Sequence, residues 1–204
     1  EFKIESSNLD ICNNCFSNTQ ELSLIDLIIK ERFNIDKHCF NNCKSLSSFL
    51  LQNEGDQILA LSKNTFNECK SLINVIIKSK SAVNLDDELF SKNKKLEKVS
   101  INCSEAIIGE KCFYECFNKN KNQIRIKSKN KIELKNNSFE NSFLNKIDLE
   151  CKELIIQQEC FKNCLKLNTF QISNIPQIHI EKCAFNGCEN LQKIILNSNR
   201  LIID

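Results

Sequence analysis

A chain of 204 residues and 23.6 kDa is long enough for one domain of ordinary size or two small ones, and too long for a disulfide mini-protein. Apolar residues make up 41% and charged residues 26%, with a formal net charge of +2, which is a folded, soluble composition rather than that of a disordered or nucleic-acid-coating chain. Three Gly, one Pro and 14 Phe exclude collagen-like and low-complexity chains, and no stretch approaches the roughly 18 apolar residues of a membrane-spanning helix. We therefore expect a folded protein with neither nucleic-acid binding nor membrane insertion.

The chain repeats itself about a recurring Phe. Self-similarity at a period of 20 to 50 residues is typical of solenoids and related repeat folds. The position five residues before each Phe is always Ile or Leu: Ile11, Ile35, Leu61, Leu85, Ile108, Leu134, Ile156 and Ile180. The eight anchors, 22 to 26 residues apart, are Phe16, Phe40, Phe66, Phe90, Phe113, Phe139, Phe161 and Phe185.

A second apolar pattern follows most anchors. Six units carry a Leu six residues after the Phe and then two apolar residues separated by one position, which is the strand core of a leucine-rich repeat. These pairs are Ile25/Leu27, Phe49/Leu51, Val75/Ile77, Val99/Ile101, Phe170/Ile172 and Ile194/Leu196.

The fifth and sixth units deviate in register. Two extra residues within Asn118 to Asn122 move the fifth pair to Ile124/Ile126, and one missing residue places the sixth pair at Ile147/Leu149. Both changes lie between anchor and strand, where we expect a loop to absorb them.

Each unit offers two short alternating segments, which indicate strands. Between them, Phe-x-x-Cys-x-x-Leu suits a turn of 3₁₀ or short α-helix facing inward. The sequence therefore predicts an α/β repeat solenoid: about eight stacked leucine-rich units of roughly 24 residues in one domain, 1–204. Leu201 to Asp204 resemble the segment before a ninth anchor, so we expect a fragment of a longer array. With three Gly, we expect Asn to supply the positive φ of the turns.

The unit resembles a known family at Ala184 to Cys188 with Leu191, and at Cys39 to Cys43 with Leu46. These residues are similar to the BspA-type, or Treponema pallidum-type, leucine-rich repeat, whose signature is Phe-x-x-Cys followed by Leu-x-x-Ile-x-Leu. The resemblance implies a non-enzymatic, adhesin-like protein of the cell surface or secreted space that attaches to host or matrix proteins. An intracellular, cytoplasmic adaptor in protein–protein interaction is the alternative.

Thirteen Cys could indicate buried thiols, disulfides or zinc. Their recurrence with Phe and Leu favours buried thiols, and we expect Cys43, Cys69, Cys164 and Cys188 to form a reduced ladder through the core. We expect Ser at such a position to cost roughly 1 to 3 kcal/mol if no partner is available, and Ala to be milder. Abundant free thiols favour a reducing compartment, which conflicts with a surface location.

The sequence points to no cofactor, metal or catalytic residue. A nucleophilic pair of His38 with Cys39 is conceivable, but adjacent side chains usually diverge. The runs Lys92 to Lys95 and Lys119 to Lys131 are interpreted as solvated loops, with binding of an acidic glycan as the alternative.

The binding surface is predicted from strand alternation. Residues between and after the apolar pairs must face outward if the pairs face the core. Two apolar-rich units, then a basic unit and an acidic unit, suit recognition of a protein partner, although an ordinary solvated face is the alternative. The predicted partner-binding residues are Asp26, Ile28, Leu50, Gln52, Ile76, Lys78, Arg125, Lys127, Asp148 and Glu150.

Overall fold

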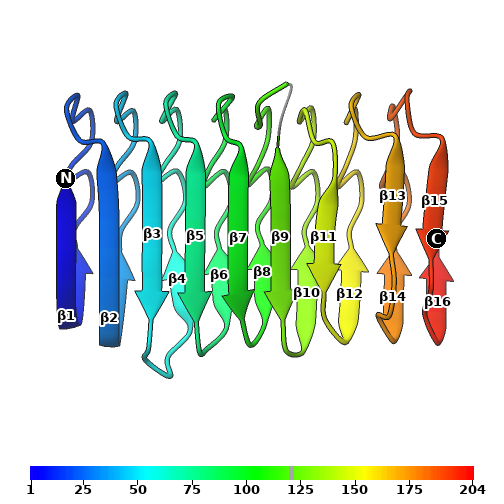
Figure 1. Ribbon diagram of the computed structural model, residues 1–204, viewed down its shortest axis with the longest axis horizontal. Coiled ribbons are helices and arrows are strands. Elements are labelled where there is room, and N and C mark those ends of the chain that lie inside the picture. Colours follow the sequence, from blue (N-terminus) through cyan, green and yellow to red (C-terminus); the bar gives the residue numbers. More distant parts are fainter. Residues whose placement is uncertain (120–121) are drawn as a thin grey trace.

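The computed structural model describes residues 1–119 and 122–204 as a solenoid of parallel strands (Figure 1). Every unit from the third onward contributes two short strands that run in opposite directions, and each strand pairs in parallel with its counterpart in the next unit, apart from one break described below. The described strands are β1 (Phe2–Ile11), β2 (Leu24–Ile35), β3 (Ser48–Asn53), β4 (Leu59–Leu61), β5 (Asn74–Ser79), β6 (Val83–Leu85), β7 (Lys98–Cys103), β8 (Ala106–Ile108), β9 (Gln123–Ser128), β10 (Lys131–Leu134), β11 (Ile147–Glu150), β12 (Glu153–Ile156), β13 (Thr169–Ile172), β14 (Gln177–Ile180), β15 (Lys193–Leu196) and β16 (Arg200–Ile203).

Two rows of strands enclose the core. We call the row β2, β3, β5, β7, β9, β11, β13, β15 the first face, and the row β4, β6, β8, β10, β12, β14, β16 the second face. The long strand β2 belongs to both, because its first half pairs with β3 while Ile35 at its end pairs with Leu61 of β4. Side chains alternate between buried and outward positions along the inner strands, as the period-2 pattern predicts, whereas every residue of the terminal strand β16 is exposed.

The anchor Phe side chains form a continuous stack through the core. Neighbouring rings lie 5.2 to 5.4 Å apart between centroids and are tilted by at most 20°. The six inner anchors are fully buried, while Phe16 and Phe185 in the outermost units are partly exposed. Because each ring contacts the ring of the next unit, the burial that one unit lacks is supplied by its neighbours.

The described residues contain no helix, so the expected α/β class and helical turns are wrong. Around the first anchor, the N–H groups of residues 15, 17 and 19 bond to the carbonyl three residues earlier, as in a 3₁₀ turn. The intervening N–H groups of residues 14, 16 and 18 donate instead to carbonyls of the second unit. A helix needs every N–H to bond within its own segment, so sharing alternate groups with the neighbouring unit gives successive turns instead.

Positive φ angles cause this alternation. In all eight units the residues two before and two after the anchor have φ between 51° and 72°. Seven of these sixteen positions are Asn, which confirms the role expected for Asn, but Glu68, Lys92 and their counterparts adopt the same conformation. A left-handed residue every fourth position interrupts any right-handed helix.

The sheet of the first face breaks between β11 and β13. Strands β13 and β15 form a separate two-stranded sheet, and no ladder in the described part of the chain joins β11 to β13. The sixth unit has one residue fewer between Phe139 and Ile147 than the seventh has between Phe161 and Phe170. Strand β11 nevertheless keeps its register with β9, so the loop before β11 absorbs this deletion as expected, and the break lies on the other side of β11. In the fifth unit β9 keeps its pairing with β7 and β11; the stretch Asn118 to Asn122 that holds the two extra residues includes 120 and 121, which lie outside the described residues.

The described part of the chain also holds no helix with the length and apolar character needed to cross a bilayer.

Candidate functional site: the outer surface of the first face

Strand register gathers the predicted binding residues into two parallel rows on the first face. The first row runs Asp26, Leu50, Ile76, Ser100, Arg125, Asp148, and the second runs Ile28, Gln52, Lys78, Asn102, Lys127, Glu150. Neighbouring positions in a row lie about 4.8 Å apart, the strand spacing of a sheet. Residues more than 120 positions apart in the chain therefore share one surface.

The first three strands of this surface carry a shallow groove of about 230 Å³. Its floor is formed by Ile28, Leu50 and Ile76, which are each half-buried. Asp26 and Lys78 also line it, and neither side chain has a hydrogen-bond or ion-pair partner among the described residues. An apolar strip with an unpaired acid and an unpaired base beside it can take an apolar side chain and orient its charged neighbours.

Farther along the first face, the basic and acidic units neutralise each other. Glu150 lies 2.6 Å from the Nζ of Lys127 and 3.7 Å from the guanidinium of Arg125, and Lys146 lies 2.9 Å from Asp148. The hydrogen bond from Lys127 lowers the pKa of the Glu150 carboxyl below its ordinary value. The charge gradient that the sequence predicts is thus largely cancelled by ion pairs across and within strands, and within the two outward rows the unpaired charges are those of the groove.

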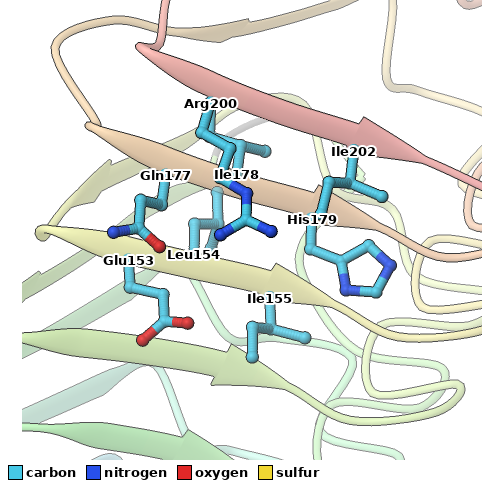
Figure 2. A pocket seen from close by; sticks show the side chains of 8 residues that line it. All are labelled: Glu153, Leu154, Ile155, Gln177, Ile178, His179, Arg200 and Ile202. Carbon is cyan, nitrogen blue, oxygen red and sulfur yellow. The ribbon is translucent and has the colours of Figure 1, made fainter.

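The second face carries a hollow of about 160 Å³ that the sequence reasoning missed (Figure 2). Glu153, Gln177 and Arg200 stand in one outward row across β12, β14 and β16, and Ile155, His179 and Ile202 stand in the next. The alternation rule finds these residues when it is applied to the shorter strands as well.

A His–Asp pair lies at the edge of that hollow, with His179 Nε2 2.9 Å from an Asp204 oxygen. A general base of this kind needs a nucleophile within hydrogen-bond reach. The eight lining residues include no Ser, Thr or Cys, so the pair has no nucleophile to activate within this hollow.

The cysteines after the anchors act as hydrogen-bond donors. Each thiol lies within hydrogen-bond distance of the carbonyl oxygen of the anchor Phe in the preceding unit, as with Cys69 and Phe40 at 3.1 Å. The five bonds span 2.9 to 3.2 Å, and Ser142 and Asn93 make the equivalent bond where Cys is replaced. The position therefore selects for a small donor rather than for a small apolar group.

The ladder predicted from the sequence is present. Cys43, Cys69, Cys164 and Cys188 are buried and free. All thirteen Cys are free, and three of them, Cys12, Cys15 and Cys183, are exposed. The thiol of Cys43, together with burial, raises the pKa of Cys69 well above its ordinary value, and burial does the same for Cys112.

His38 and Cys39 do not form a nucleophilic pair. The Cys39 thiol donates to the carbonyl oxygen of Cys12 at 2.9 Å rather than to the imidazole, and burial raises its pKa to about 11. A thiol with that pKa is protonated at neutral pH and is a poor nucleophile. Across residues 1–119 and 122–204, no three His, Cys, Asp or Glu side chains are placed to hold a metal ion.

Comparison with known families agrees with this architecture. The family model described as the BspA type leucine rich repeat region matches the chain in six copies, over residues 1–120 and 83–204. The chain belongs to the BspA-type leucine-rich repeat family. No curated protein and no solved structure matches it. Membership of the BspA-type family indicates a protein-binding repeat scaffold, and leucine-rich solenoids are typically non-enzymatic.

Proposed function

We propose that the protein is an adhesin-like scaffold of the cell surface, which binds a host or matrix protein through the groove on its first face. The observation that carries this proposal is the pairing of an apolar strip with free charges. Ile28, Leu50 and Ile76 supply apolar contact area, and Asp26 and Lys78 remain available to a partner's charges.

The partner is expected to present an apolar side chain flanked by charges of opposite sign. Asp26 lies on β2 and Lys78 on β5, in different outward rows, so the two charges lie diagonally across the strip. A partner segment that crosses the strands would place a basic group near Asp26 and an acidic group near Lys78. Because rim charges contribute mainly to association rate and orientation, affinity should depend chiefly on the apolar strip.

Binding to a panel of purified extracellular matrix proteins, measured by biolayer interferometry, tests the proposal. Ile76→Asp should abolish binding of any matrix protein that binds the wild type. Ile107→Asp is the matched control, because Ile107 is an equally half-buried outward Ile on β8 of the second face. If no matrix protein binds, or if both variants bind like the wild type, the proposal is wrong.

An intracellular adaptor is the second candidate, favoured by the thirteen free thiols. Ten of them are buried, however, and burial keeps oxidants away from thiols even outside the cell. Labelling intact cells with a membrane-impermeant reagent separates the two candidates. The adhesin proposal expects the chain to be labelled, whereas the adaptor expects labelling only after lysis.

A further inference from the structure

The break in the first face leaves backbone groups of the seventh unit without partners. In the fifth and sixth units, the N–H groups of Lys129 and Lys152 donate to the preceding unit, at 3.2 Å to Cys103 and 2.7 Å to Asn130. Residues 173–175 make no such bond to the sixth unit in the described part of the chain, and Pro176, the counterpart of Lys152, has no N–H to donate. The ends of β11 and β13 therefore lack the bonds that join the earlier strand ends.

A hollow of about 690 Å³ lies where these strand ends separate. Its walls come from four successive units: Asn102 of the fourth, Ser128 and Lys129 of the fifth, Glu150 and Lys152 of the sixth, and Ser173 and Asn174 of the seventh are among the lining residues. Its volume falls within the roughly 300 to 1,000 Å³ of ordinary small-ligand sites.

The walls offer unpaired donors and excess positive charge. The side chains of Lys129, Lys152, Ser173 and Asn174 have no partner among the described residues. The one carboxylate in the walls, Glu150, is already bound by Lys127, another lining residue, and by Arg125. Two free ammonium groups beside a hydroxyl and an amide form a surface suited to an anionic, hydroxyl-rich ligand.

We propose that this hollow binds an anionic glycan, with Lys129 and Lys152 holding a sulfate or carboxylate group and Ser173 and Asn174 bonding sugar hydroxyls. A peptide strand added between β11 and β13 does not fit the geometry. Their Cα atoms approach within 8 Å of each other. An inserted strand requires about 9.6 Å, twice the strand spacing.

The glycan site is independent of the groove that carries the proposed function, because it lies at the other end of the first face and shares no residue with the groove. Loss of glycan binding would leave binding of a protein partner intact, and the reverse holds as well. The two proposals therefore fail separately.

Isothermal titration calorimetry with a heparin-derived octasaccharide, in about 150 mM salt so that weak surface attraction is screened, tests the proposal. The double variant Lys129→Gln/Lys152→Gln should weaken binding by about tenfold or more. The control Lys37→Gln/Lys44→Gln removes the same charge from two exposed Lys outside the hollow and should change affinity by less than about twofold. Ser173→Asp, which places a carboxylate in the hollow, should weaken binding as the first pair does.

Three results would overturn the proposal. The first is that the wild type does not bind the octasaccharide. The second is that both double variants lose affinity equally, which would indicate attraction by net charge alone. The third is that poly-glutamate displaces the octasaccharide at a similar concentration and its own affinity falls in the same variants, which would make the ligand an acidic peptide. Unchanged circular dichroism of the variants, all altered at exposed positions, excludes misfolding as the cause.

Discussion

Replacing Cys69 separates a donor role from a packing role in the ladder. Its thiol donates to the carbonyl oxygen of Phe40 at 3.1 Å, and both side chains are fully buried. Ala leaves that carbonyl without its donor, which costs about 1 to 3 kcal/mol, and the lost sulfur volume adds about 1 kcal/mol. Cys69→Ala should therefore lower the free energy of unfolding by about 2 to 4 kcal/mol.

Ser keeps the donor, and Ser142 already makes the equivalent bond to Phe113 elsewhere in the ladder. Cys69→Ser should therefore stay within about 1 kcal/mol of the wild type. Urea unfolding measures both values, with Cys183→Ala, at an exposed thiol, as a control expected within about 0.5 kcal/mol. Ala is thus expected to be more destabilising than Ser, the reverse of the order predicted from the sequence. The repeat pattern reveals the Cys but not the Phe40 carbonyl oxygen that accepts its hydrogen bond. If Ala proves milder than Ser, the donor role is refuted.

Three further predictions concern the thiols and the break in the sheet. Titration of the native protein should modify the three exposed thiols quickly, and denaturation without reductant should release all thirteen; a smaller total would reveal disulfides. Burial raises the pKa of Cys103 from 9.0 to about 11, so the unfolded state loses this proton first. The free energy of unfolding should then fall as pH rises from about 9 to about 11, by about 1.4 kcal/mol per pH unit for such a thiol, and a flat profile would contradict the burial. In hydrogen exchange, the amides of residues 173–175 should exchange faster than those of Lys129 and Lys152; equal protection would mean that the sheet is unbroken.

The core could be predicted from the sequence because its pattern is periodic. Each unit must bury the same positions against its neighbours, so Phe66, Cys69 and Leu72 recur with their counterparts and all three are fully buried. The outward rows followed from the same alternation.

The turns and the charge pairs could not be predicted from that periodicity. Glu68 and Lys92 take left-handed conformations that their residue types do not signal. The cross-strand bond from Lys127 to Glu150 depends on register between units 23 residues apart, which the list of outward residues does not encode. The broken sheet depends on how β11 and β13 pack against each other, which the repeat pattern does not encode.

Photo-crosslinking tests the account of the groove most directly. A photoreactive phenylalanine analogue would replace Leu50 on the groove floor in one variant and Ile107 on the second face in another, and each would be irradiated with a matrix protein that binds the wild type. The account predicts cross-linking to that protein from position 50 and little from position 107. Equal cross-linking from both positions, or cross-linking from position 107 alone, would contradict it.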